Sequence, residues 1–276
     1  MDMLNAVDSF IWGPPLLVLL VGTGILLTLR LKLLQVVHLP KALSLIFKAQ
    51  NAGHGDIDSF KALCTALSAT VGTGNIVGVA TAIAAGGPGA IFWMWMAAFF
   101  GMATKYAEGL LAVKYREVDA KGEIAGGPMF YIKNGMGPKY KWLGTLFAVF
   151  GVLVAYFGIG TFAQVNSIVD ITKMTIGLDP MWTAIILTAL VAAITLGGLQ
   201  SIAKAASKIV PAMAVIYFIS TIGVLCYFAD QVPAAVEMII SNAFTGTAAA
   251  GGFLGSTIML AMRNGIARGV FSNESG

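Results

Sequence analysis

The sequence predicts an all-α integral membrane protein, and three observations lead to this fold class. Of the 276 residues, 58% are hydrophobic and only 11% are charged, whereas a soluble domain carries about a quarter charged residues. The apolar residues gather in uncharged runs of about the length that crosses a bilayer. These runs lack the short alternating pattern of a membrane β-barrel, so each is expected to form a helix that satisfies its own backbone hydrogen bonds.

Seven such runs are expected to span the membrane. The seventh gives the weakest prediction, because Gly, Ala, Ser and Thr dominate it. The runs are Ile11–Leu29, Ala62–Ala85, Gly86–Thr104 (extending past two charges toward Val113), Trp142–Val169, Pro180–Ala203, Ile209–Ala229 and Met238–Met262. Acidic residues, Asp2 and Asp8, stand where a cleaved signal peptide would be basic, so the first run is expected to remain in the protein.

The distribution of Lys and Arg predicts the orientation in the membrane. Loops 30–61, 114–141 and 200–208 together hold thirteen basic residues, whereas the tail and loops of the opposite side hold only Lys173. Basic loops remain in the cytoplasm, so a multi-pass protein of the cytoplasmic membrane with its N-terminus outside is predicted. This topology also accounts for the formal charge of +4 without nucleic acid as a partner.

The sequence offers little for enzymatic chemistry. The two histidines, His38 and His54, lie in or beside the first basic loop, and no HExxH, GxSxG or Walker-type sequence is present. The two cysteines, Cys64 and Cys226, lie in separate apolar runs, which is typical of small buried side chains rather than a zinc site. We therefore predict no enzyme activity, no zinc-type metal site and no cofactor.

A polar segment lies at the centre of the second apolar run. It reads Ser68-Ala-Thr-Val-Gly-Thr-Gly-Asn75, and Thr73 stands near the middle of the run. Two glycines weaken a helix, and a break at this depth would expose backbone N–H and C=O groups that suit a carboxylate and a small cation such as Na⁺. The alternative is close helix packing through small residues, and spacing alone leaves both interpretations open.

Three further polar groups have two interpretations each. The terminal segment Arg268–Gly276 is either a second break or an ordinary loop. The segment Ile124–Ile132 is either a short interfacial helix or part of an inner gate. Lys105 and Glu108, three residues apart, are expected to pair on one helix.

Several stretches of the chain resemble the sodium:alanine symporters, the alanine-or-glycine:cation symporter family. The most specific is the aromatic-rich sequence Gly86–Gly101. The segments Ser68–Asn75, Gly126–Tyr131 and Gly269–Glu274 resemble the same family. The resemblance implies a leucine-transporter-like inverted-repeat fold in which the first helix of each repeat is broken. Residues 1–30 would form an extra N-terminal helix, residues 60–229 the first five-helix repeat, and residues 238–276 the start of an incomplete second repeat.

The resemblance also implies roles for individual residues. Backbone N–H groups of Gly72, Thr73 and Gly74 would bind the substrate carboxylate. The side-chain oxygen of Asn75 would bind sodium. The remaining candidates are carbonyl groups near sodium (Ser68, Thr70, Val71) and residues that would line the substrate pocket (Gln164, Phe271, Ser272, Asn273).

The implied function is sodium-coupled symport of a small neutral amino acid, alanine or glycine, across the cytoplasmic membrane. The partners would be this substrate, the sodium ion and the lipid bilayer. Family members are nearly twice as long, so the chain is expected to be a fragment that does not transport alone. The alternatives are a proton-coupled amino-acid transporter of the same fold, with Glu108 or Glu274 carrying the proton, and a non-transporting membrane subunit.

Overall fold

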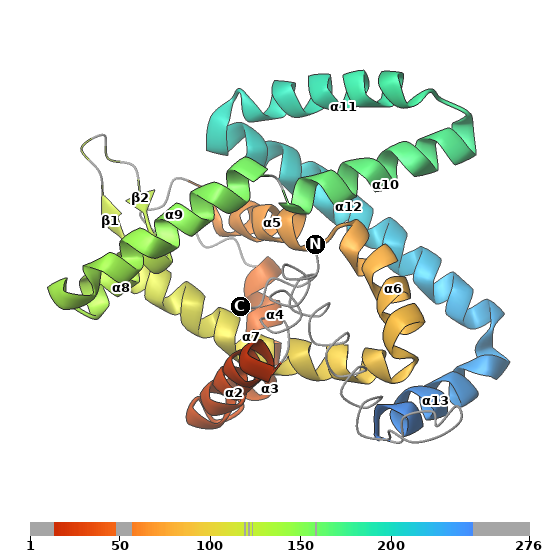
Figure 1. Ribbon diagram of the computed structural model, residues 1–276, viewed down its shortest axis with the longest axis horizontal. Coiled ribbons are helices and arrows are strands. Elements are labelled where there is room, and N and C mark those ends of the chain that lie inside the picture. Colours follow the sequence, from red (N-terminus) through yellow and green to blue (C-terminus); the bar gives the residue numbers. More distant parts are fainter. Residues whose placement is uncertain are drawn as a thin grey trace, which may run out of the picture. The chain divides into compact units, whose positions relative to one another are not determined.

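The computed structural model describes residues 14–47, 57–118, 120, 122, 124–157 and 159–244. These residues form helices joined by short turns, together with one pair of two-residue strands (Figure 1). They divide into two compact units. The first contains the described parts of residues 1–42, 69–105 and 210–276, and the second contains the described parts of residues 43–68 and 106–209. The helical class predicted from the sequence is confirmed.

The first unit is built around the N-terminal half of α7. Its elements are α2 (Pro14–Arg30), α3 (Leu34–Val37), η1 (Thr73–Asn75), α6 (Val77–Gly86), η3 (Ala229–Gln231), α13 (Val232–Phe244) and portions of α4 (Leu39–Phe47), α5 (Ser59–Thr70), α7 (Gly89–Lys114) and α12 (Gly198–Tyr227). Small residues allow close packing here. A Cβ on Gly24 of α2 would lie 2.8 Å from the Cβ of Phe100 on α7, so α2 and α7 are in contact at this point.

The second unit contains a compact corner around α8 (Pro128–Gly135). Residues Glu117–Val118 (β1) pair antiparallel with Ile124–Ala125 (β2). The turn η2 (Pro138–Tyr140) then leads into α9 (Lys141–Phe157), which packs on α8. The contact is close, because a Cβ on Gly144 of α9 would lie 2.8 Å from the carbonyl oxygen of Met129. Of the segment Ile124–Ile132, the part from Pro128 onward is therefore helical as the start of α8, and a role in an inner gate stays untested.

The same unit contains a hairpin of α10 (Ile159–Ile176) and α11 (Pro180–Thr195), which lie side by side in Figure 1. The turn between them is encoded locally. Gly177 adopts a left-handed conformation with φ +70°, and the Asp179 side chain caps α11 by accepting a hydrogen bond from the Met181 backbone at 2.8 Å. Pro180 occupies the first turn of α11, where a missing N–H is tolerated.

Some predicted span boundaries are wrong. Trp142–Val169 was expected to be one span, but α9 ends at Phe157 and α10 begins at Ile159. Glycine is a weak helix former, and the sequence has Gly158 between these two helices and Gly160 in the first turn of α10. The predicted first long loop, 30–61, contains α3 and α4 and the start of α5.

The predicted loop 200–208 is helical and belongs to α12. Its Ala, Lys, Gln and Ser residues favour or tolerate a helix, and no Gly or Pro interrupts them. The chain turns earlier, at Leu196 and Gly197 before Gly198, which has φ +69°. With 30 residues, α12 is about 45 Å long, so it exceeds the hydrocarbon thickness and can carry Lys204 and Lys208 beyond it.

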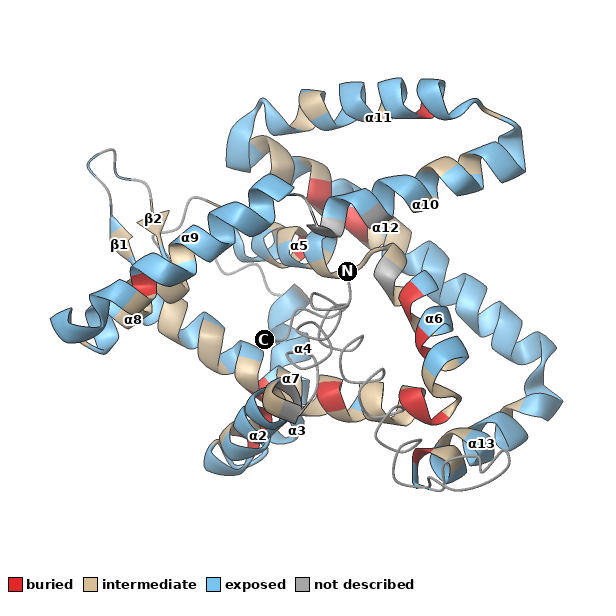
Figure 2. Ribbon diagram, viewed as in Figure 1, coloured by how far each residue is buried: buried red, intermediate tan, exposed pale blue. Residues whose placement is uncertain are grey.

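Two described helical stretches are long and apolar enough to cross a membrane, Pro138–Phe157 and Gly198–Tyr227. Shorter apolar helices are Val18–Arg30, Val77–Gly86 and Pro180–Thr195. The second predicted span appears as two short helices, α5 and α6, because its middle is not α-helical. Large apolar side chains along α9 to α12 are widely exposed (Figure 2), including Leu196 and Met174, each 87% exposed. Lipid would cover such side chains, whereas water would not favour their exposure.

Candidate functional site

The candidate site is the interruption between α5 and α6, residues Val71–Ile76. Helix α5 ends at Thr70, and Gly72 is extended with φ −152° and ψ −166°. Residues Thr73–Asn75 then form a single 3₁₀ turn, in which Asn75 N donates to Gly72 O at 3.1 Å and Ile76 N donates to Thr73 O at 3.1 Å. Of the two interpretations of the polar segment Ser68–Asn75, the structure therefore has the helix interruption.

The interruption separates two helix ends of opposite polarity, the C-terminus of α5 and the N-terminus of α6. Carbonyl groups point toward the C-terminus of a helix, so the last turn of α5, which includes Ser68 and Thr70, presents carbonyl oxygens to the interruption. The first turn of α6, beginning at Val77, presents N–H groups. The partial negative charge of one end suits a cation, and the partial positive charge of the other suits a carboxylate.

Asn75 supplies the most informative atom of this site. Its Oδ1 is buried and has no hydrogen-bond partner among the described residues. Leaving a buried polar atom unpaired costs about 1–3 kcal/mol, so native structures rarely contain one without a reason. An amide oxygen without a donor in reach can coordinate a small hard cation, because such cations bind oxygen ligands.

The other predicted site residues are distributed as follows. Ser68 is exposed on α5 and donates its hydroxyl to Thr65 O at 2.7 Å, so its side chain is used within the helix and its carbonyl remains the candidate ligand. Val71 and Thr73 are half-buried in the interruption. Gln164 lies on α10 in the second unit with an exposed side chain. Phe271, Ser272 and Asn273 lie outside the described residues.

The segment before α9 is held by an exposed charged cluster. Lys133 Nζ donates to Glu117 Oε1 at 2.8 Å, and Asn134 Nδ2 donates to the same oxygen at 2.9 Å. These two donors lower the pKa of the Glu117 carboxyl below its ordinary value. Tyr131 of α8 is half-buried, and this burial, with the Glu108 carboxylate nearby, raises the pKa of its hydroxyl.

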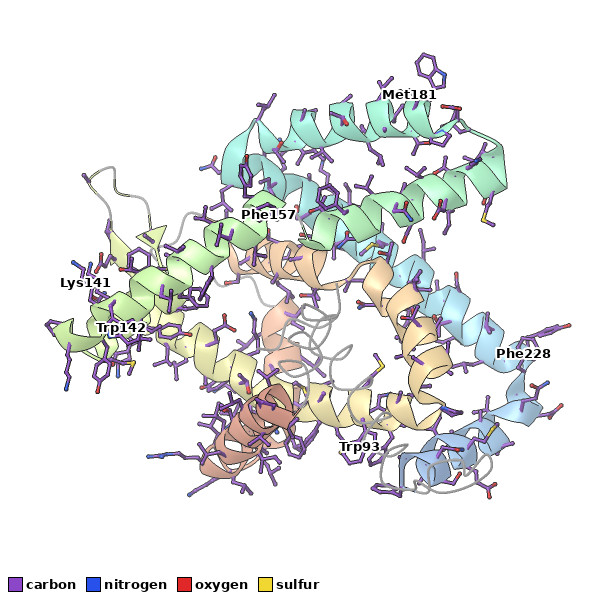
Figure 3. The ribbon with its side chains drawn as sticks, viewed as in Figure 1. Trp93, Lys141, Trp142, Phe157, Met181 and Phe228 are labelled. Atoms are coloured by element: carbon purple, nitrogen blue, oxygen red, sulfur yellow. The ribbon has the colours of Figure 1, made fainter. Side chains whose placement is uncertain are left out.

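Sequence reasoning missed a second feature, the contact between α7 and α13. A Cβ on Gly89 would lie 2.4 Å from Asn242 O and 2.7 Å from Ala243 N. Trp93, labelled in Figure 3, donates its Nε1–H to Ala243 O at 3.2 Å. The ring of Phe244 meets Phe92 and Trp93 edge-on, with centroids 5.0 and 5.9 Å away. Gly, Phe and Trp recur in the Gly86–Gly101 sequence, but nothing in α13 indicates their partner.

Comparison with known proteins assigns the whole chain to one family. The sequence profile of the Sodium:alanine symporter family matches residues 1–276. The chain belongs to the sodium:alanine symporter family. The resemblance expected from Gly86–Gly101 is thereby confirmed, and membership of this family implies a protein of the cell membrane.

Curated relatives are similar along almost the whole chain. An uncharacterized transporter of Haemophilus influenzae is 57% identical over 275 residues, covering 100% of this chain and 60% of the relative. The sodium/alanine symporter AgcS of Methanococcus maripaludis is 51% identical over 280 residues, again covering 100% and 60%. The probable sodium/glutamine symporter GlnT of Bacillus subtilis is 39% identical, covering 98% and 55%. The chain thus spans about 60% of the length of the first two relatives.

Proposed function

We propose that this chain contributes the first repeat of a sodium-coupled symporter for a small neutral amino acid, alanine or glycine. Membership of the family supports sodium as the coupling ion, and the similarity to AgcS supports alanine. The name of GlnT shows that substrates differ among relatives. The short side chain of alanine or glycine fits the roles that the family resemblance gives to Gly72, Thr73 and Gly74, which bind through backbone groups.

The observation that carries the proposal is the unpartnered Oδ1 of Asn75 at a helix interruption. Sodium would be coordinated by this oxygen and by carbonyl groups of Ser68, Thr70 and Val71. The substrate carboxylate would accept hydrogen bonds from the N–H groups of Gly72, Thr73 and Gly74. Gln164, Phe271, Ser272 and Asn273 would complete the substrate pocket in a leucine-transporter-like inverted-repeat fold.

In this mechanism, sodium moves inward down its gradient, and a membrane potential of 100 mV adds about 2.3 kcal/mol per charge. Sodium stabilises the outward-facing state that binds substrate, and substrate then permits the change to the inward-facing state. The N-terminus would lie outside, consistent with the basic loops. Because the two ligands are linked, alanine must tighten sodium binding by the same factor by which sodium tightens alanine binding.

Radiolabelled alanine uptake into proteoliposomes tests this proposal. Uptake is measured for this chain and for a protein in which the remaining C-terminal part of the Haemophilus influenzae relative follows residue 276. Inward sodium, potassium and proton gradients are compared. Uptake that requires the sodium gradient supports the proposal. Uptake driven by a proton gradient alone would favour the proton-coupled alternative, with Glu108 or Glu274 as its carrier, and no uptake under any gradient would favour a non-transporting subunit.

A further inference from the structure

The segment that follows α2 has no role in the proposed transport site, yet backbone and side-chain hydrogen bonds hold it. Helix α2 ends in a Schellman motif, in which Leu33 N donates to Thr28 O at 2.9 Å and Lys32 N donates to Leu29 O at 3.1 Å. Lys32 and Leu33 both adopt left-handed conformations, with φ 55° and 56°. Non-glycine residues rarely do so, so the turn is maintained by its surroundings.

A side-chain contact holds the same corner from the other side. Gln35 of α3 donates its Nε2–H to the buried Thr28 hydroxyl of α2 at 3.0 Å. Only Leu31–Leu33 separate α2 from α3, and three residues reach about 10 Å at most. If α2 is the first membrane span, α3 and α4 must therefore begin at the membrane surface.

Helix α4 has two faces of different character. Leu39, Leu43 and Ile46 recur at helical spacing and are 49%, 51% and 37% exposed. Lys41 and Ser44 lie on the opposite side of the helix, with the exposed Leu45 beside Lys41. A helix with one apolar stripe and one polar face is typical of segments that lie in the plane of a bilayer surface.

The charge around α4 is of one sign. Arg30, Lys32 and Lys41 are basic, and the sequence contains no Asp or Glu from residue 9 to residue 55. A basic segment directly beside a membrane span is attracted to anionic headgroups. This charge complementarity and the position of the corner at the end of α2 favour an anionic lipid surface as the cover of the apolar stripe.

We propose that Leu34–Phe47 is an interfacial anchor that lies on the anionic leaflet of the membrane. Leu39, Leu43 and Ile46 enter the boundary between headgroups and acyl chains, and Arg30, Lys32 and Lys41 contact anionic headgroups. The proposal rests on α2 being a membrane span and does not depend on symport. It therefore stands or fails independently of the uptake experiment.

The test places single cysteines on the two sides of α4. Ile46→Cys and Ser44→Cys are made in a Cys226→Ser background, in which the remaining Cys64 is buried. Each is labelled with an environment-sensitive fluorophore in vesicles of phosphatidylcholine with or without phosphatidylglycerol. Lipids brominated on their acyl chains quench from the membrane, and iodide quenches from water. We expect acyl-chain quenching at position 46 to exceed that at position 44 by about threefold, and iodide to quench position 44 more strongly.

A second part of the experiment tests the role of charge by comparing Lys41→Gln with Lys173→Gln. Lys173 lies in the last turn of α10 and serves as the control. Lys41→Gln is expected to reduce acyl-chain quenching at position 46 in anionic vesicles only, and Lys173→Gln is expected to leave it unchanged. Equal quenching at positions 44 and 46 would overturn the proposal. Protection of position 46 from both quenchers would also overturn it and would indicate a protein partner such as a second copy. An effect of Lys41→Gln that is the same in both vesicle types would overturn it as well.

Discussion

Two regions of the first unit use glycine and polar groups in opposite ways. At the α7–α13 contact, Gly89 lets a helix approach the Asn242 carbonyl, and the Trp93 indole N–H is paired with Ala243 O. At the interruption, the extended Gly72 stands where α-helix stops, and the Asn75 Oδ1 is buried without a partner among the described residues. The first region satisfies its polar groups internally, whereas the second leaves one available. This difference supports the proposal that the first is a structural contact and the second a binding site.

The largest effect is expected from Gly89→Ala. The added Cβ meets a backbone carbonyl that cannot move without shifting α13, so we expect a loss of about 3 kcal/mol of stability, the upper range for overpacking. Gly109→Ala on the same helix is the matched control, because a Cβ at Gly109 would have no neighbouring atom within 4 Å. Alanine also favours a helix over glycine by up to about 1 kcal/mol. Unfolding in mixed detergent micelles measures both. Equal effects of the two substitutions would contradict the conclusion that close packing at Gly89 stabilises the α7–α13 contact.

A smaller effect is expected from Gly24→Ala on α2. Its Cβ would lie 2.8 Å from the Phe100 Cβ and 3.0 Å from the Phe100 carbonyl oxygen. These distances are longer than those at Gly89, so the overlap is smaller and we expect a loss of about 1–2 kcal/mol. Gly22→Ala, with nothing within 4 Å, should be neutral or stabilising. The same unfolding assay measures the pair, and a stabilising Gly24→Ala would show that α2 does not pack closely on α7.

Trp93→Phe removes the hydrogen bond to Ala243 O and retains an aromatic ring. The expected loss is about 1 kcal/mol, the net value of one hydrogen bond with its acceptor left in place. Trp95→Phe on the same helix serves as the control, because Trp95 is exposed. If both substitutions had the same effect on unfolding, the Trp93 hydrogen bond would contribute nothing to the α7–α13 contact.

The smallest effect concerns the exposed Glu117–Lys133 pair beside α8. Because the folded pKa of Glu117 is lowered from 4.5, its stabilising contribution is complete above pH 4.5 and is lost as the pH falls through the folded value. Glu117→Gln should make this local stability independent of pH in that range. Hydrogen exchange of the α8 amides, compared between the two proteins at each pH, provides the measurement. Identical pH profiles would show that the pair does not hold α8.

The sequence predicts the features that depend on local residues. Glycines and polar groups at residues 72–75 predicted either an interruption or close helix packing, and the structure has an interruption. Helix α7 extends past Lys105 and Glu108 to Lys114, close to the expected extension. The short helix α8 is present where an apolar patch interrupts a basic loop. These predictions succeed because helix propensity and apolar run length act over a few residues.

Features that depend on distant residues could not be predicted. The loop expected at 200–208 is helical, because its charges indicated a membrane boundary rather than the end of a helix. The partners of Gly89 and Trp93 are about 150 positions away in the sequence. One sequence contains no signal for such a pairing. The burial of the Asn75 Oδ1 likewise depends on the packing around it. The sequence could therefore predict Asn75 as a candidate residue but could not predict that its oxygen is buried without a partner among the described residues.

The central claim is that Asn75 binds sodium. Its most direct test measures the thermal stability of this chain joined at residue 276 to the C-terminal part of the Haemophilus influenzae relative, with and without sodium and with potassium as the control cation. We compare the unsubstituted protein, Asn75→Leu and Asn166→Leu, whose exposed amide donates to Asp170. Without sodium, Asn75→Leu should be at least as stable as the unsubstituted protein, because a buried unpaired oxygen is removed. Sodium at 100 times its Kd should stabilise the unsubstituted protein and Asn166→Leu by about 2.7 kcal/mol, and Asn75→Leu much less. If Asn75→Leu were destabilised without sodium and retained the full sodium effect, Asn75 would be a packing residue and the account would be contradicted.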